Sequence, residues 1–89
     1  MSAESYVFIH FSLLADAEPG LLGRVLAPFA RRDLVVDRVT AERIGDAMRI
    51  EIEMVAMPSE MATYVEGNLR QIVGLRRLER DRPLRSRAA

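Results

Sequence analysis

The middle of the sequence carries the pattern of a β-hairpin, in which two antiparallel strands are joined by a tight turn. In "RIGDAMRIEIEMVAM", the step Gly45-Asp46 separates a β-rich stretch from one in which apolar and charged residues alternate. The alternation predicts one apolar inner face, made of Met48, Ile50, Ile52, Met54 and Ala56. The outer face of the same strand carries Arg49, Glu51 and Glu53.

Two further stretches predict strands. Residues 6–15, "YVFIHFSLLA", place Val7, Ile9, Phe11, Leu13 and Ala15 on one face. The other face, with Phe8, His10, Ser12 and Leu14, is half apolar, which is typical of a strand in the centre of a sheet. Residues 34–44, "LVVDRVTAERI", are also β-rich, and a bulge near Asp37 and Arg38 would bring Leu34, Val36, Val39 and Ala41 to one face.

Two segments have the apolar spacing of helices that pack on a core. In residues 19–32 the stripe stays in phase through Pro28, which predicts one kinked helix with Pro19 in its first turn. This stripe consists of Leu21, Leu22, Val25, Leu26, Phe29 and Ala30. We expect Ser59 to cap the second helix and Gly74 to end it. Its predicted buried stripe is Met61, Tyr64, Val65, Leu69, Ile72 and Val73.

The short charged segment "LRRLER", residues 75–80, is typical of an edge strand. The order of elements is then β-α-β-β-α-β, which predicts an α+β protein of the ferredoxin-like class. In this topology a four-stranded antiparallel sheet has the order 4-1-3-2 and two helices on one face. We expect one domain at residues 6–80, after a lead of residues 1–5 and before a disordered basic tail at residues 81–89.

The sequence shows no constellation that could carry catalysis. It contains no Cys, which excludes thiolate nucleophiles and disulfides, and its one histidine, His10, has no metal-ligand spacing around it. Ser12 has no recognisable base, and Glu51 and Glu53 fit a solvated strand face. No apolar run is long enough to span a membrane, and the N-terminus lacks the pattern of a signal peptide. We therefore expect a cytoplasmic protein that is not an enzyme and holds no metal or cofactor.

The junction between the first strand and the first helix is the best candidate for a binding site. The N-terminus of a helix presents free N–H groups and a partial positive charge, and Gly20 has no side chain to block access to them. The junction could therefore hold a carboxylate. It could equally be a simple turn that starts a helix, and the residues alone leave both interpretations open.

Residues 18–39, "EPGLLGRVLAPFARRDLVVDRV", resemble the ACT domain, and in particular the small regulatory subunit of acetolactate synthase (acetohydroxyacid synthase). The resemblance extends over about residues 6–80 and rests on the Pro-Gly step and the Phe-Ala-Arg-Arg segment. It implies a non-catalytic regulatory subunit or module that acts on a catalytic partner of branched-chain amino-acid biosynthesis.

The resemblance also implies a ligand site at the interface of two such modules. One module would supply the loop Asp16, Ala17, Glu18, Pro19, Gly20 and Leu21, and the neighbour would supply Val35 and Asp37. Ala17 and Val35 stand where the family often has Asn, and Asp33 stands where many members have Gly. Because Ala and Val offer no polar side-chain contact, we expect small amino acids to bind weakly.

Two kinds of protein partner are expected. The small core and the half-apolar second sheet face favour a homodimer in which the second strands of two chains pair. The segment from Arg70 to Ala89 has seven Arg against Glu79 and Asp81, a formal charge of +5. We expect Arg76, Arg77 and Arg80 to contact an acidic catalytic partner, such as the acetolactate synthase catalytic subunit or another metabolic enzyme.

Three other functions are compatible with this topology. The first is a free-standing amino-acid sensor with a different client. The second is a nucleic-acid-binding module, because Phe8 and His10 could stack on bases, although Glu51 and Glu53 beside them would repel phosphate. The third is an enzyme built on the same fold. We expect neither a nucleic acid nor a membrane as a partner.

Overall fold

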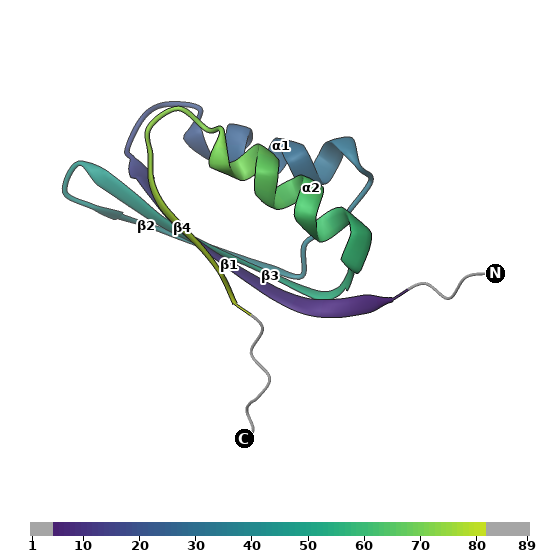
Figure 1. Cartoon of the computed structure of the whole chain (residues 1–89). Coiled ribbons are helices and arrows are strands. Elements are labelled where there is room, and N and C mark those ends of the chain that lie inside the picture. The colour runs from purple at the N-terminus through teal and green to yellow at the C-terminus, as the bar shows by residue number, and fades with distance from the viewer. Residues whose placement is uncertain (1–4, 82–89) are drawn as a thin grey trace, which may run out of the picture.

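The structure, a computed structural model, describes residues 5–81 and contains six elements in the predicted order. They are β1 (Tyr6–Asp16), α1 (Leu21–Arg31), β2 (Arg38–Ile44), β3 (Ala47–Pro58), α2 (Ser59–Arg70) and β4 (Leu75–Asp81). The four strands form one antiparallel sheet in the order β2-β3-β1-β4, and both helices lie on one face of it (Figure 1). This arrangement confirms the ferredoxin-like fold. Asp81 belongs to β4, and the rest of the predicted tail lies outside the described residues.

The hydrophobic core lies between the sheet and the two helices. The predicted inner face of β1 is buried from Ile9 to Ala15, and Ile50, Ile52 and Met54 of β3 lie beside it. The rings of Phe11 and Phe29 meet edge to face, with centroids 6.1 Å apart, and so join the central strand to α1. The alternation in the sequence therefore identified the two central strands correctly, and their buried faces correctly as far as Met54 of β3.

Helix α1 is a single helix that includes Pro28, as predicted, but it begins later than expected. Gly20 is its N-cap, so Pro19 lies before the helix and not in its first turn. Pro28 is itself buried, whereas Leu22 and Ala30 are exposed. The buried stripe is therefore Leu21, Val25, Pro28 and Phe29, which is the i, i+4, i+7, i+8 face of the helix.

Helix α2 differs from its prediction at both ends. Pro58 is the N-cap, Ser59 is the first helical residue and no side chain caps the helix. The helix ends at Arg70, so Val73 and Gly74 belong to the turn that leads into β4, and Val73 is exposed. Tyr64 is also exposed, and the guanidinium of Arg32 lies 5.6 Å from the centre of its ring, outside the core. The buried helical residues are Ala62, Val65 and Leu69.

The second strand is shorter than predicted, and the expected bulge lies in its neighbour. Residues 34–37 are not in a strand, and β2 begins at Arg38. The irregularity is in β3: Ile9 pairs with Met54 but Val7 pairs with Met57, so β3 has one extra residue there. The extra residue reverses the alternation, and Met57 is buried while Ala56 is exposed.

The edge strand β2 extends beyond the cover of the helices. Val39 and Ala41 pair with Ile52 and Ile50, which places them on the helix-covered face of the sheet, yet both side chains are exposed. They were predicted to share a face with Leu34 and Val36, which pack against the core before the strand starts. The free edge of β2 therefore has exposed apolar side chains beside it.

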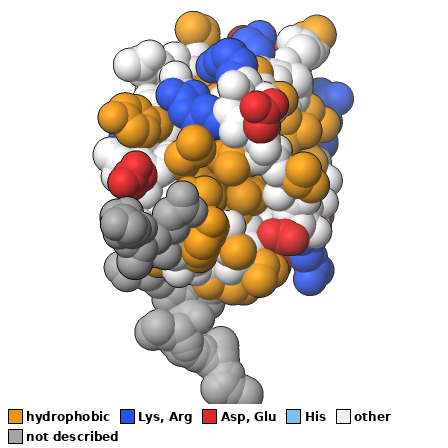
Figure 2. Space-filling model, turned by 90° about the vertical axis from the view of Figure 1, so that its right-hand side faces the viewer, with side chains coloured by type: hydrophobic (Ala, Val, Ile, Leu, Met, Phe, Trp, Pro, Cys, Tyr) orange, Lys and Arg blue, Asp and Glu red, His pale blue; other side chains and the backbone are white. Residues whose placement is uncertain are grey.

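The end of the sheet opposite the β2–β3 turn is also apolar on its surface. Tyr6 and Val55 are more than half exposed, and Val35 is 84 % exposed. Tyr6 pairs with Pro58, and Val55 contacts Asp37, so these residues belong to the same end of the molecule. Figure 2 looks onto this end and shows apolar side chains gathered between charged ones.

Candidate functional site

The loop between β1 and α1 is fastened to two neighbouring turns. The backbone N–H of Asp16 donates to the carbonyl of Gly74, and the N–H of Ala17 donates to the carbonyl of Asp46, both at 2.9 Å. The first bond joins the loop to the turn before β4, and the second joins it to the β2–β3 turn. Two backbone hydrogen bonds thus hold the start of the loop that the sequence indicated as a candidate site.

The side chain of Arg76, on β4, contacts the same two segments, the start of the loop and the β2–β3 turn. Leu14 pairs with Arg77 and Ala15 pairs with Leu75, so Arg76 is the extra residue of an irregularity in the strand. Its Nε donates to Asp16 Oδ1 at 2.7 Å, and its Nη2 donates to Asp46 Oδ1 at 3.3 Å. These contacts, with Asp16 first, raise the pKa of the Arg76 guanidinium above its ordinary value. Arg76 therefore holds the loop and the β2–β3 turn together, and its contact with a partner stays a prediction.

Beside the start of the loop lies an open hollow of about 380 Å³. Residues 17–23 form one wall, and Arg43 and Met48 complete it. Gly20 has a φ of 82°, a left-handed conformation that suits glycine, and no side chain caps the helix that follows. The first turn of α1 also has no acidic residue, so its partial positive charge faces the hollow without a carboxylate of its own.

Arg43 adds a full positive charge at the rim of the hollow. Its Nε donates to the carbonyl of Gly45 at 3.0 Å, which fixes the guanidinium beside the β2–β3 turn. Glu18, on the opposite wall, is paired with Arg24 at 3.4 Å. With Leu22 and Met48 as apolar surface, the hollow can hold an anionic group attached to an apolar one.

Four of the lining residues were not predicted as site residues from the sequence: Leu22, Gly23, Arg43 and Met48. The hairpin pattern contained the signal for two of them. Met48 pairs with Ala15 on one side and with Arg43 on the other, so the three residues stand in a row beside the loop. A register counted back from the Gly45-Asp46 turn would have brought Arg43 to the site.

Val35 and Asp37 do not line this hollow within one chain. The N–H of Asp37 donates to the carbonyl of Glu53 at 3.0 Å, and its carboxylate accepts from the N–H of Val55 at 2.6 Å. Both residues therefore lie at the end of the sheet away from the loop. One chain contains the loop half of the expected ligand site and holds the other half at a distance.

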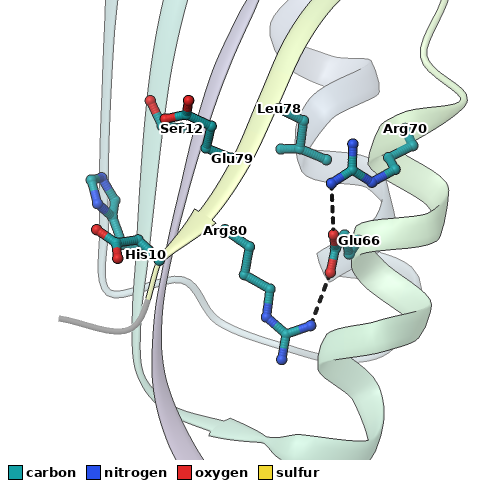
Figure 3. Close-up of a pocket in the computed structure, with 8 residues that line it drawn as sticks. His10, Ser12, Glu66, Arg70, Leu78, Glu79 and Arg80 are labelled. Atoms are coloured by element: carbon teal, nitrogen blue, oxygen red, sulfur yellow. Dashed lines mark hydrogen bonds and ion pairs between the residues drawn. The ribbon is translucent and has the colours of Figure 1, made fainter. Parts of the chain in front are cut away.

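The other two arginines expected to contact a partner lie on different faces. Arg80 donates to Glu66 of α2 at 2.9 Å, and Arg70 reaches the same carboxylate at 2.9 Å. These two hydrogen bonds, that of Arg80 first, lower the pKa of Glu66 below its ordinary value. Figure 3 shows Arg70, Glu66 and Arg80 on one side of β4, and His10, Ser12 and Glu79 on the other. Arg77 is exposed and has no ion pair with any residue in the range 5–81.

The described residues contain no other arrangement that suggests chemistry. His10 Nε2 lies 3.0 Å from Glu51 Oε1 on the open face of the sheet, without a nucleophile between them. Within residues 5–81 no group of three or more His, Cys, Asp or Glu side chains could hold a metal ion. No helix of that part of the chain is long and apolar enough to cross a membrane.

Comparison with solved structures supports the fold. The ACT domain of a GTP pyrophosphokinase from Chlorobium tepidum superimposes with a TM-score of 0.72 in its crystal form, at 10 % identity over 85 % of this chain and 99 % of that one. Its solution structure gives 0.71 at 11 % identity, over 89 % of this chain and 90 % of that one. An uncharacterised protein from Thermotoga maritima gives 0.72 at 11 % identity, over 88 % and 98 %. No curated protein matches the sequence significantly.

The sequence itself matches the family of ACT-like domains over residues 2–82, which is nearly its whole length. Domains of this family are typically regulatory modules that bind amino acids. The strand order, the two helices on one face and the Pro-Gly loop all agree with that match. The chain belongs to the ACT-like domain family.

Proposed function

We propose that this chain is a non-catalytic regulatory module that works as a homodimer and acts on a catalytic partner enzyme. The observation that carries the proposal is the open hollow at residues 17–23, with an uncapped helix N-terminus and Arg43 at its rim. The partner we propose first is the catalytic subunit of acetolactate synthase, in branched-chain amino-acid biosynthesis. This choice rests on the resemblance of residues 18–39 to the small subunit of that enzyme.

The free edge of β2 supports the homodimer. Its backbone groups are open to a further strand, and Val39 and Ala41 expose apolar side chains beside it. Two copies of β2 that pair antiparallel around a two-fold axis would cover both the open backbone groups and these apolar side chains. The result is one continuous eight-stranded sheet with all helices on the same face.

The charge pattern of β2 favours one register for this pairing, with the two-fold axis at Thr40. Arg38 then lies opposite Glu42 of the second copy, and Val39 lies opposite its Ala41. One step further along, Asp37 comes opposite Arg43 of the second copy. A register centred on Ala41 would instead set Arg38 against Ile44 and lose both charge pairs.

This register would also complete the ligand site. Antiparallel pairing carries the start of β2 of one copy to the end of β2 of the other, where Arg43 borders the hollow. Val35 and Asp37 of the second copy would then stand at the rim of the hollow that residues 17–23 form. The two halves that one chain keeps apart would meet across the dimer.

The second candidate function is a free-standing amino-acid sensor with a different client. The observation that favours it is Arg43, a cation beside the uncapped helix that could bind the carboxylate of an amino acid. Ala17 and Val35 weigh against tight binding, because they give no polar contact to the amino group.

Co-purification from the native cell tests the partner, and sedimentation equilibrium tests the dimer. We expect a thiamine-diphosphate-dependent catalytic subunit to co-purify with the chain.

Ala41→Lys should weaken self-association, because it places a charge against Val39 of the second copy, whereas Ala41→Val should preserve it. A catalytic subunit of another enzyme in the pulldown would favour the sensor. A 10.0 kDa species alone at micromolar concentration would contradict the dimer.

A further inference from the structure

The face of the sheet that the helices leave open carries its side chains in three rows that cross the strands. From β2 through β3 and β1 to β4, the first row is Arg38, Glu53, His10 and Asp81. The second row is Thr40, Glu51, Ser12 and Glu79. The third row is Glu42, Arg49, Leu14 and Arg77. Figure 3 shows three of these side chains, His10, Ser12 and Glu79, on the side of β4 away from α2.

Opposite charges occupy matching places in the first and third rows. The pairs, with the first-row residue given first, are Arg38 and Glu42 on β2, Glu53 and Arg49 on β3, and Asp81 and Arg77 on β4. On β1 the matching places hold His10 and Leu14. The second row lies midway, so a half-turn about it exchanges the first row with the third.

We propose that this open face binds the same face of a second copy of the chain, through a two-fold axis that runs along the second row. The rotation keeps each strand over its own counterpart and lays the first row of one copy on the third row of the other. Arg49 then faces Glu53 of the second copy, and Arg77 faces its Asp81. Symmetry repeats each contact, so that every charge of these two rows meets its opposite.

Of the six charged side chains of the outer rows, the four on β3 and β4 are available for such contacts, whereas Arg38 and Glu42 on β2 would also meet across the β2 pairing. Within residues 5–81 none of the six takes part in an ion pair, whereas nine other charged side chains and His10 do. Stacked sheets lie about 10 Å apart with their strands nearly aligned. Facing Arg and Glu side chains are long enough to meet across such a gap.

A different, acidic protein fits this face less well than a second copy does. It would find Arg49 and Arg77 in the third row, but Glu51, Glu53, Glu79 and Asp81 would repel it over the rest of the face. A second copy turned by the two-fold axis presents acidic groups only where the first copy is basic. The second row is the exception, because Glu79 faces its own symmetry mate there, whereas Glu51 is engaged by His10 at 3.0 Å.

The two symmetry axes would combine into a closed assembly. The axis of the β2 pairing passes through Thr40, and Thr40 is also a member of the second row. The axes then cross at right angles, which generates a tetramer with 222 symmetry and no open end. The tetramer requires the β2 dimer that is proposed above. The contact between open faces does not depend on that dimer.

Sedimentation equilibrium of the full chain tests the contact. At low salt we expect a species of four times the 10.0 kDa chain mass, which dissociates to dimers as salt screens the ion pairs. Arg49→Glu should weaken the association of dimers by about tenfold or more, because at each contact between open faces it replaces two attractive pairs with two repulsive ones. The double variant Arg49→Glu with Glu53→Arg should restore it. Glu79→Gln should strengthen it.

Controls separate this contact from the β2 dimer. Arg31→Glu makes the same charge change on α1, away from the open face, and should leave the tetramer intact. A wild-type dimer that Ala41→Lys splits and Arg49→Glu leaves unchanged would overturn the contact between open faces and keep the β2 dimer. A tetramer that Arg49→Glu weakens without recovery in the double variant would also overturn it. A dimer that persists in Ala41→Lys and is split by Arg49→Glu would support the contact and overturn the β2 dimer.

Discussion

The carboxylate of Asp37 accepts a 2.6 Å hydrogen bond from the backbone N–H of Val55, at the point where β3 contains its extra residue. Asp37 lies just before β2, so one side chain both starts the edge strand and satisfies a backbone group that the irregularity would leave without a partner. The bond lies beside the extra residue that buries Met57 and exposes Ala56.

Asp37→Ala should therefore lower the free energy of unfolding by about 1 kcal/mol, because it removes a hydrogen bond to a charged acceptor and leaves the Val55 N–H to water. Asp37→Asn retains an acceptor oxygen and should cost less. Urea unfolding of the three proteins measures both differences. Identical midpoints for the wild type and the Ala variant would contradict this role of Asp37.

The irregularity in β3 is a feature that the sequence pattern does not predict. Strict alternation predicts Ala56 inside, but the extra residue of β3 reverses it, and this residue is accompanied by a contact over 18 residues of sequence, between Asp37 and Val55. Tyr64 was expected in the buried stripe of α2, but the buried face of this helix is Ala62, Val65 and Leu69, and the ring of Tyr64 lies outside it against Arg32. The local sequence pattern predicts the helices and strands and their buried faces well. It does not predict the contacts between elements that accompany a register shift or a rotated helix.

The candidate site was predictable in part for the same reason. The Pro-Gly step located the loop, because the conformation of Gly20 and the start of α1 are local properties. Arg43 and Met48 enter through the pairing of three strands, which requires the register as well as the elements. The role of Arg76 was missed because the strand irregularity that turns it toward Asp16 leaves no mark in the sequence pattern.

Arg76 should control the rigidity of the site loop. Arg76→Met removes the contacts to Asp16 and Asp46, so we expect faster hydrogen exchange at the N–H of Ala17, which bonds to Asp46 in the same cluster. Arg77→Met is the matched control, because its side chain is exposed and lies on the other face. Equal exchange at Ala17 in both variants would contradict the role of Arg76 as the fastener of the loop.

Glu66 should contribute to the pH dependence of stability. Arg80 and Arg70 lower its pKa in the folded protein from the ordinary value of 4.5, so the unfolded chain binds the proton more readily. The contribution is therefore present above about pH 4.5 and is lost as the pH falls through the lower, folded-state pKa. Its side chain is 21 % exposed and Arg70 is 53 % exposed, so we expect at most about 1 kcal/mol at neutral pH.

Urea unfolding of wild type and Glu66→Gln from neutral to acidic pH measures this contribution. The difference between the two proteins should shrink as the pH falls. Arg80→Met should reproduce part of the change, because Arg80 is the first cause of the lowered pKa. A difference that stays constant with pH would show that Glu66 acts by packing and not by charge.

Small amino acids should bind the hollow weakly. A ligand raises stability by about 2.7 kcal/mol at a hundredfold excess over its dissociation constant. Valine, leucine and isoleucine at millimolar concentration should shift the melting temperature little, because Ala17 and Val35 provide no polar contact. Gly23→Leu would fill the hollow without backbone strain, since apart from its chain neighbours and the backbone of its own helix nothing lies within 4 Å of the position of its Cβ. A large, saturable shift that disappears in Gly23→Leu would favour the sensor.

The most direct measurement is the turnover of the acetolactate synthase catalytic subunit from the same cell, titrated with the purified chain. A regulatory module must bind the active and inactive states of its partner with different affinity, and a coupling of about 1–3 kcal/mol changes that affinity by about 5- to 150-fold. We expect the chain to raise turnover or to change the feedback response in a saturable way. If it neither binds the catalytic subunit nor alters its turnover at low or moderate salt, the proposed partner is wrong, and the chain remains an ACT-like domain whose client is a different protein or none.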